Sequence, residues 1–414
     1  MQNSKISVNG RLYSRSERPV VVVCIDGSQP EYMTQAMAKG SMPWLKRTLE
    51  NHGTDRIADS VVPSFTNPNN ISIVTGVPPS MHGICGNFFY NRDTDEEVMM
   101  DDTQFLRAGT IFKAFQDAQA KVVAITAKDK LRKLLGYELK FTEGSAICFS
   151  AEKADQTSLH ENGIENVLEM VGMPVASVYS AELSEFVFAA GVKIMERERP
   201  ELMYLSTTDF IQHKYAPGTD EANAFYQMMD AYWAQLDEME TVITLTADHG
   251  MNAKHDDEGN PEIVFLQELF DQWYGKENAR VILPITDPYV VHHGALGSFA
   301  TVYLSKKVDA NDAIHRLRSL DGITMALSGA AGCRYFELSE DRLGDIIIVS
   351  GLKTTLGTMQ ERHDLSALKL PLRSHGGTTE QKVPFLSNRP MPKLPPDMHL
   401  RNFDAFYASL NYAE

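Results

Sequence analysis

The chain has 414 residues, with 39 basic against 55 acidic side chains and a formal net charge of −16 at pH 7. This length can bury a large core in one elaborated domain or in two to three ordinary ones. The acidity argues against broad binding to nucleic acid or to anionic membranes, because both need a basic face.

The N-terminal segment and the cysteines bear on the cellular compartment. The first nineteen residues are polar and lack the apolar stretch of a signal peptide, and no apolar run approaches the ~20 residues of a membrane helix. Cys24, Cys85, Cys148 and Cys333 show no CxxC spacing, which favours reduced, mostly buried thiols over disulfides or a sulfur-metal site. We therefore expect a cytoplasmic protein.

Short apolar runs alternate with longer amphipathic stretches as far as Met251. The apolar runs, which we expect to be central strands, are residues 20–25, 121–125, 202–206 and 242–247. The stretches with helical periodicity are residues 42–52, 110–119, 180–197 and 220–238. This alternation predicts an α/β fold with a mostly parallel sheet between helices, in which ligands bind beyond the carboxyl ends of the strands.

The pattern changes after Met251. Strands near residues 298–304 and 346–350 and a helix near 310–320 are punctuated by proline and glycine. A segment of this length is too long for an ordinary loop, so we predict an inserted α+β cap at 252–365, with 1–251 and 366–414 forming the core. The proline-rich tail from Lys382 is expected to run over the surface.

Residues of metal-ligand type stand where the predicted strands end. Asp26 follows the first apolar run, Asp209 and His213 are four residues apart, and Asp248 and His249 follow another apolar run directly before Gly250. Carboxylate and imidazole groups are ligands that zinc accepts, and six of them with one hydroxyl suffice for two tetrahedral sites. The seven residues are Asp26, Thr66, Asp209, His213, Asp248, His249 and His375.

Two members of this set have an informative local context. Thr66 precedes Pro68, which fits the first turn of a helix, and a hydroxyl at a helix N-terminus lies in a place that favours an anion. Asp209 and His213, one helical turn apart, can bind a single cation. Each feature alone also fits an ordinary helix cap or an unrelated histidine. The occurrence of all seven in one chain favours the metal site.

Five segments resemble the alkaline phosphatase superfamily, in particular its phosphodiesterase-like branch. They are VVVVCIDG (20–27), PSFTNPNNISIVTG (63–76), TTDFIQH (207–213), TLTADHGM (244–251) and SHGG (374–377). The resemblance implies an alkaline phosphatase-like core with a cap beside it, two zinc ions per chain and Thr66 as the nucleophile. It assigns one zinc to Asp209, His213 and His375, and the other to Asp26, Thr66, Asp248 and His249.

Two further segments, GNFFYN (86–91) and TAKDKLRKLLG (126–136), resemble the members of that branch that hydrolyse phosphonoacetate. This implies that Asn87 donates its amide to a phosphoryl oxygen and that Lys128 and Lys130 hold the carboxylate of a small anionic phosphonate. The implied reaction cleaves the C–P bond to acetate and phosphate through a phosphothreonine. Without the resemblance, the basic stretch through Lys133 is more typical of a solvated face.

Other functions stay open. A nucleotide pyrophosphatase or phosphodiesterase shares the seven residues and would need an aromatic nucleoside pocket, which Phe88, Phe89 and Tyr90 could supply. A cofactor-independent phosphoglycerate mutase normally has serine at the nucleophile position. A catalytically silent zinc-dependent binding protein would not need a positioned Thr66.

The sequence also leaves two points undetermined. His292 and His293 are adjacent and would face opposite ways in an extended segment, so their roles are open. The oligomeric state is not determined, and a homodimer remains an alternative.

Overall fold

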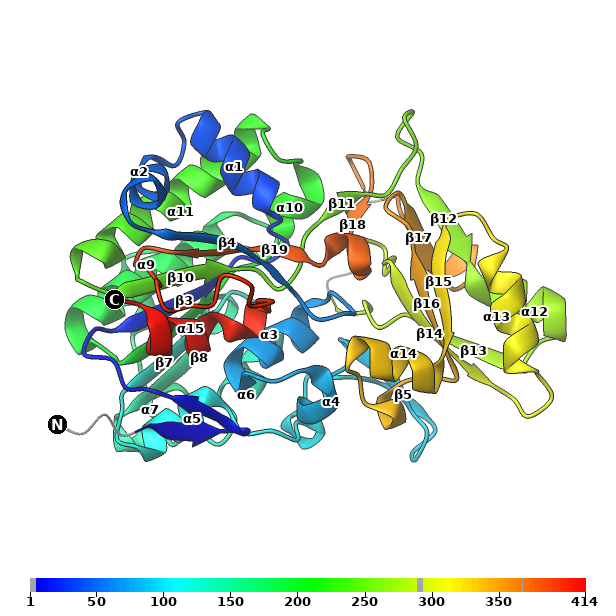
Figure 1. Ribbon diagram of the computed structural model, residues 1–414, viewed down its shortest axis with the longest axis horizontal. Coiled ribbons are helices and arrows are strands. Elements are labelled where there is room, and N and C mark those ends of the chain that lie inside the picture. Colours follow the sequence, from blue (N-terminus) through cyan, green and yellow to red (C-terminus); the bar gives the residue numbers. More distant parts are fainter. Residues whose placement is uncertain (1–4, 289–292, 367) are drawn as a thin grey trace.

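The computed structural model describes residues 5–288, 293–366 and 368–414, and Figure 1 shows two lobes. The larger lobe contains a seven-stranded sheet of order β4-β19-β10-β3-β9-β7-β8. Neighbours from β10 to β8 run parallel, whereas β19 is antiparallel to β10 and β4. The strands are β4 (Thr54–Asp59), β19 (Lys382–Ser387), β10 (Val242–Thr246), β3 (Val20–Cys24), β9 (Leu202–Ser206), β7 (Val122–Thr126) and β8 (Ala146–Ser150).

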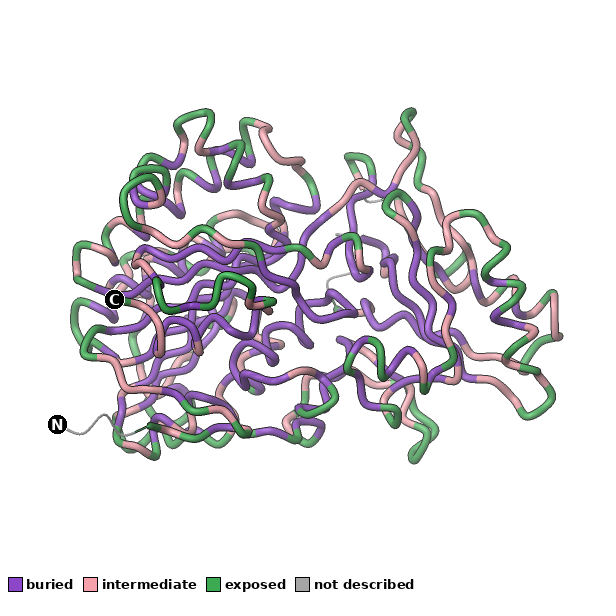
Figure 2. Tube along the Cα trace, viewed as in Figure 1, coloured by how far each residue is buried: buried purple, intermediate pink, exposed green. Residues whose placement is uncertain are grey.

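Helices cover both faces of this sheet, and β3 shows why. Successive side chains of a strand point to opposite faces. Val20 and Val22 therefore lie in a cluster with α3 (Thr66–Thr75), α5 (Ile111–Asp117) and α15 (Ala405–Tyr412). Val21 and Val23 lie in a second cluster, with α1 (Pro30–Ala38), α2 (Pro43–Asn51), α9 (Glu182–Glu198) and α11 (Asp220–Glu238). The central strands are buried throughout in Figure 2, so an unbroken valine run suits them.

The predicted α/β fold with a mostly parallel sheet is confirmed. The four predicted strands are β3, β7, β9 and β10, and the four predicted helices are α2, α5, α9 and α11, with ends shifted by one or two residues. Shorter elements complete the chain up to residue 251, and one hairpin among them, residues 88–99, lies against the smaller lobe (Figure 1). They are β1 (Ile6–Val8), β2 (Arg11–Tyr13), α4 (Pro79–His82), β5 (Phe88–Asn91), β6 (Glu96–Met99), α6 (Asp129–Leu135), α7 (Leu159–Asn162), α8 (Val167–Val171) and α10 (Phe210–Lys214).

The prediction that the tail from Lys382 runs over the surface is wrong. Strand β19 lies inside the sheet, with residues 383–387 buried, and α15 packs against the sheet behind it. Pro384 is tolerated because β10 pairs only with Leu386 and Ser387, so no ladder bond to β10 is lost at the proline. Only the residues after the strand, such as 392–393 and 395–397, are exposed as the prolines suggested.

The smaller lobe contains a four-stranded antiparallel sheet of order β13-β14-β16-β15. Its strands are β13 (Ala279–Ile282), β14 (Phe299–Leu304), β16 (Ile346–Ser350) and β15 (Ile323–Ser328), with helices α12 (Leu266–Tyr274), α13 (Ala310–Arg318) and α14 (Gly329–Phe336) and the parallel pair β12 (Glu262–Phe265) and β17 (Thr354–Gly357). The chain leaves the larger lobe at β11 (Asn252–Ala253) and returns at β18 (Arg373–Ser374), and these two strands pair with each other. The cap limits at 252 and 365 remain a prediction.

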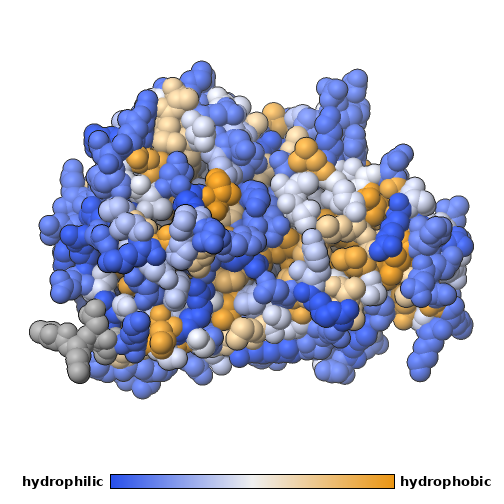
Figure 3. Space-filling view, viewed as in Figure 1, coloured by the Kyte–Doolittle hydropathy of each residue, from blue (hydrophilic) through white to orange (hydrophobic). Residues whose placement is uncertain are grey.

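The character of the surface and the state of the cysteines are as the sequence suggested. The face seen in Figure 3 is mostly hydrophilic. Among the described residues, no helix combines the length and apolar character needed to cross a membrane. All four cysteines are buried and free, as predicted.

Candidate active site

Three neighbouring strands of the large sheet each lead into an aspartate. Strands β10, β3 and β9 lie side by side, and Asp248, Asp26 and Asp209 follow them in that order. Parallel strands end at the same edge of a sheet, so the three carboxylates converge. Their residues are 0, 2 and 5% exposed, which places three acidic groups together out of water.

The turn after β3 is built so that these carboxylates can approach. Gly27 has a φ of +72°, and a Cβ there would lie 3.3 Å from Cβ of Asp209. Its N–H donates to Oδ1 of Asp248 at 3.2 Å, while the N–H of Asp26 donates to Oγ1 of Thr207 at 2.9 Å. Glycine supplies both the left-handed backbone and the space, since a Cβ here would crowd Gln212, Met251 and Asp209.

The three predicted metal-site histidines share one hydrogen-bonding pattern. In each, Nδ1 lies 2.8–2.9 Å from a backbone carbonyl oxygen, which can only accept a hydrogen bond. Nδ1 therefore carries a proton, and Nε2 is the ring nitrogen that can bind a cation. The pairs are His213 with Arg373, His249 with Gly250 and His375 with Ser64.

The ligand atoms form two groups that share His249. One group is Asp26, Asp248 and His249, and the other is Asp209, His249 and His375; within each, the ligand atoms lie within 4.8 Å of one another. His213 also approaches, with Nε2 2.9 Å from Oδ2 of Asp209. The predicted division assigned His249 to the site of Asp26 and Asp248 only. In the structure its ring also stacks on that of His375, a residue of the other group, at 3.6 Å between centroids.

The donor set fits bound cations. Oδ1 of Asp26 and Nε2 of His249 are buried 3.3 Å from each other, and neither has another hydrogen-bond partner among the described residues. Burial and the charges of Asp209 and Asp248 raise the pKa of Asp26 to about 8. Burial lowers the pKa of His249, but the charges of Asp248 and Asp26 outweigh it and raise that pKa to about 9. Without cations, bound protons offset the negative charge of the clustered carboxylates. Bound cations would displace these protons and offset the same charge.

Thr66 is the first residue of α3 and lies against this cluster through Asn70. One helical turn after Thr66, Nδ2 of Asn70 donates to the Thr66 carbonyl at 2.9 Å and to Oδ2 of Asp248 at 3.3 Å. Oδ1 of Asn70 accepts from the hydroxyls of Tyr204 and Ser206. Asn70 therefore ties the helix of the predicted nucleophile to a metal-site aspartate. It lies within the motif at 63–76, but its side-chain role could be seen only from the fold.

Asn87 is brought to the start of the same helix. It is 1% exposed, and its Oδ1 accepts from the N–H of Asn67 at 3.1 Å. Its Nδ2 makes only a long contact of 3.5 Å with the Ile285 carbonyl. The amide N–H₂ therefore keeps donor capacity for a ligand beside Thr66.

Lys128 and Lys130 are buried beside the cluster, so a solvated basic stretch does not describe these two side chains. Their side chains are 7 and 4% exposed. Nζ of Lys128 lies 3.3 Å from Oδ1 of Asp209, and Nζ of Lys130 lies 2.9 Å from Oδ2 of Asp287. Burial lowers the pKa of Lys128, but the charges of Asp209, Asp287 and Asp26 raise it above its ordinary value. Both ammonium groups are therefore held at the site.

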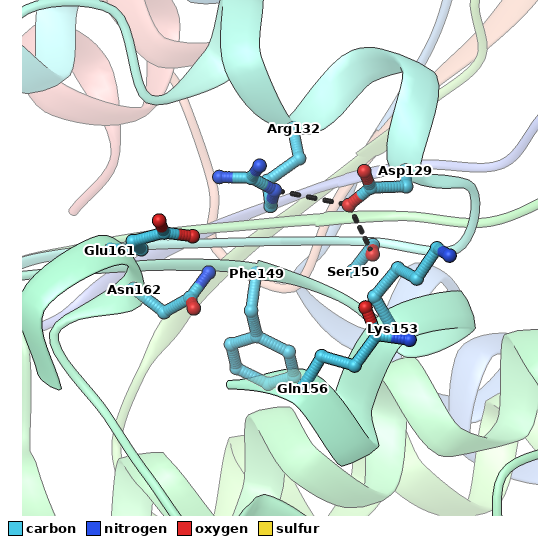
Figure 4. Close-up of a pocket in the computed structure, with 8 residues that line it drawn as sticks. All are labelled: Asp129, Arg132, Phe149, Ser150, Lys153, Gln156, Glu161 and Asn162. Carbon is cyan, nitrogen blue, oxygen red and sulfur yellow. Dashed lines mark hydrogen bonds and ion pairs between the residues drawn. The ribbon is translucent and has the colours of Figure 1, made fainter. Parts of the chain in front are cut away.

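Asp129, between the two lysines, bonds elsewhere and anchors the start of α6. Figure 4 shows it on the wall of a polar cavity of about 250 Å³, with Oδ1 accepting from Ser150 at 2.7 Å and from Nε of Arg132 at 3.0 Å. Its N–H donates to Glu152 at 2.7 Å. The Lys-Asp-Lys alternation thus directs the lysines to one set of partners and the aspartate to another.

Two residues of the smaller lobe reach the site between β13 and β14. Burial raises the pKa of Asp287, but Lys130, His293 and Lys128 outweigh it and hold the pKa of that carboxyl well below its usual range. Sequence reasoning missed Asp287, because an aspartate before a proline is typical of any turn. His293 is buried, with its ring centroid 5.4 Å from that of His213. His292 lies outside the described residues.

The aromatic residues after Asn87 pack within the protein. Phe89 is 3% exposed and contacts Phe105 at 5.2 Å between centroids. Tyr90 packs against Tyr303 at 5.0 Å, with the guanidinium of Arg280 over its ring. Phe89 is therefore enclosed, whereas Tyr90 is partly exposed and lines a surface pocket with Arg92 and Tyr303.

Comparisons with known proteins identify relatives along the whole chain. The family model for type I phosphodiesterase / nucleotide pyrophosphatase matches residues 20–378. Phosphonoacetate hydrolase from Sinorhizobium meliloti 1021, solved in complex with phosphonoformate and with phosphonoacetate, is 56% identical over 100% of both chains, with a TM-score of 0.97.

A more distant solved structure shares the fold, and a more distant curated protein matches in sequence. Murine ectonucleotide pyrophosphatase / phosphodiesterase 5, in an inactive form in complex with AMP, is 15% identical over 96% of both chains, with a TM-score of 0.64. An uncharacterized pyrophosphatase/phosphodiesterase of Schizosaccharomyces pombe is 22% identical over 262 residues, which are 61% of this chain and 48% of that protein. The chain thus spans about half the length of this curated relative.

Proposed function

Because the chain belongs to the type I phosphodiesterase / nucleotide pyrophosphatase family of metal-dependent hydrolases, we propose that it hydrolyses the carbon–phosphorus bond of phosphonoacetate to acetate and phosphate. The observation that carries this proposal is the pair of buried lysines, Lys128 and Lys130, beside a cluster of metal-ligand residues. A compact substrate with a phosphonate at one end and a carboxylate at the other matches this arrangement of charges.

The phosphonate would lie over the metal-ligand cluster, with Thr66 and the amide of Asn87 at the start of α3. A helix N-terminus favours an anion through its free N–H groups and its dipole. The carboxylate would lie toward Lys128 and Lys130. Both lysines already have acidic partners, and these partners orient the ammonium groups before the substrate arrives.

The proposed reaction has two steps. The Thr66 hydroxyl releases its proton to solvent as Oγ1 attacks phosphorus, the C–P bond breaks, and its electron pair passes to the methylene carbon as an enolate-like acetate dianion. Lys128 and Lys130 offset the growing charge on the carboxylate oxygens, and the carbon then takes a proton from solvent to give acetate. Water next attacks the phosphothreonine, the bond to Oγ breaks, and Thr66 recovers its hydroxyl as phosphate leaves.

We propose two zinc ions per chain as the metal. Asp26, Thr66, Asp248 and His249 would hold one, and Asp209, His213 and His375 the other, with the cap at 252–365 beside them. Aspartate and neutral histidine are common zinc ligands. When bound, such cations neutralise phosphoryl charge and make a hydroxyl or water easier to deprotonate. We propose a small anionic phosphonate as the partner, and the acidic surface argues against nucleic acid.

A comparison of substrates tests this function. Metal-loaded protein is assayed for product release from phosphonoacetate, phosphonoacetaldehyde and a nitrophenyl phosphodiester. We expect a clear preference for phosphonoacetate, because only this substrate offers a carboxylate to the lysines. A preference for the phosphodiester would contradict the proposal and favour a phosphodiesterase.

A further inference from the structure

His293 differs from the other histidines of the site in having no backbone partner. The ring nitrogens of His213, His249 and His375 that face away from the cluster each meet a carbonyl. Nδ1 of His293 is buried and makes no hydrogen bond with any described residue. A buried polar atom without a partner costs free energy, so it marks a place where a ligand can supply the bond.

The position of His293 defines which part of a ligand it would meet. Its ring lies 5.4 Å from that of His213 and 6.4 Å from that of His375, so it borders the Asp209 side of the cluster. Its charged neighbours include Asp287 and Lys128, which are the groups around the lysine pair. His293 therefore borders both the metal-ligand cluster and the lysines that we assign to the carboxylate.

The backbone holds this residue in place. The carbonyl of His293 accepts from the N–H of Leu296 at 2.9 Å, and the carbonyl of the next residue, Gly294, accepts from Nδ1 of His363 at 2.8 Å. Nε2 of His363 in turn accepts from the N–H of Thr358. Both ring nitrogens of His363 thus have hydrogen-bond partners, and His363 supports the turn. The same turn holds the backbone of His293 in place.

We propose that His293 contacts the substrate and determines specificity by donating a hydrogen bond from Nδ1 to the carboxylate end of a phosphonocarboxylate. This inference rests on the proposed function and adds a donor from the smaller lobe to the two lysines of the larger lobe. A neutral imidazole carries one N–H, and an anionic acceptor selects the tautomer with that proton on Nδ1. The hydrogen bond would be charge-assisted, and the turn fixes its direction.

The test compares two proteins and two ligands in one thermodynamic cycle. Full-length, metal-loaded wild type and His293→Leu are titrated calorimetrically with phosphonoformate, which has a carboxylate, and with methylphosphonate, which lacks one. We expect His293→Leu to weaken phosphonoformate binding by roughly tenfold to a hundredfold and methylphosphonate binding by less than about twofold, the scale of one hydrogen bond to a charged group. His293→Asn, whose amide can reach the position of Nδ1, should keep most of the affinity.

Two further measurements separate this inference from the proposed function. Turnover of phosphonoacetate by the wild type tests the function, whereas the calorimetric preference tests His293 without catalysis. His363→Leu serves as the matched control, since it disturbs the same turn and should affect both ligands equally. If His293→Leu does not fold, His293→Phe gives the same cycle. Equal losses on both ligands, no loss on either, or an asparagine variant as poor as the leucine variant would overturn the proposal.

Discussion

Replacing Lys130 by methionine should separate its contribution to stability from its contribution to catalysis. Methionine keeps the length of the side chain but removes the ammonium group that lies 2.9 Å from the Asp287 carboxylate. Both side chains are less than a tenth exposed, so the change leaves a buried charge with less compensation. Breaking a buried pair from one side typically costs about 3–5 kcal/mol, and we expect Lys130→Met to lower the free energy of unfolding by that amount at neutral pH.

The pH dependence of this loss follows from the pKa of Asp287. The depressed pKa of Asp287 contributes stability above its unfolded value of about 3.9, and this contribution is lost as the pH falls further. In Lys130→Met the carboxyl can take up a proton more easily. The deficit relative to wild type should therefore be largest at neutral pH and shrink as the pH falls toward about 4.

The matched control is the double variant Lys130→Met with Asp287→Asn. It removes both charges, so most of the lost stability should return in denaturant titrations. The kcat/KM for phosphonoacetate should stay reduced by roughly tenfold to several hundredfold, because the cation that would face the carboxylate is still missing. A phosphodiester without that carboxylate should be affected far less. The reasoning is refuted if the double variant regains full activity on phosphonoacetate, since Lys130 would then act only through the fold.

Three further outcomes are expected. Thr66→Ala should lose nearly all turnover while it still binds phosphonoformate, and Thr66→Ser should retain part of the activity; wild-type kcat in the alanine variant would exclude the phosphothreonine. Elemental analysis should give two zinc ions per active chain, and chelation should abolish turnover until zinc is added; full activity with one ion or none would contradict this. Metal-free protein should lose stability as the pH rises from about 4 to 8. Because the pKa of Asp26 is raised, the folded state holds a proton that the unfolded state releases in this range. For one group the loss is at most roughly 1.4 kcal/mol per pH unit. Unfolding of metal-free and zinc-loaded protein across that range checks this sign, and an increase in stability with pH would show it to be wrong.

The central strands could be predicted because burial on both faces leaves a direct trace in the sequence. A run such as Val20 to Cys24 has no polar alternation, and few other structures explain it. The positions of Asp26, Asp209 and Asp248 after such runs then bring them to one edge by the geometry of a parallel sheet. This is why a metal cluster could be expected before any coordinates.

The remainder depends on contacts between distant parts of the chain. Strand β19 was missed because the prolines after it dominate the composition of the tail, while its own burial depends on β4 and β10. Asp287 becomes part of the site only because the smaller lobe folds back onto α6. Asn70 and His293 are defined by which of their polar atoms have partners. None of these properties is periodic along the sequence, so no local pattern could indicate them.

The place of β19 also constrains when the protein can complete its fold during synthesis. Strand β4 has a single neighbour in the large sheet, and that neighbour begins at Lys382, paired with Asp59. The residues between β4 and β19, which include the entire smaller lobe, are synthesised before β19. Until then β4 and one edge of β10 have no strand to pair with. Unpaired strand edges in nascent chains are sites of misassociation. A chain that stopped before Lys382 would therefore lose an interior strand, and β4 would have no neighbour in the sheet.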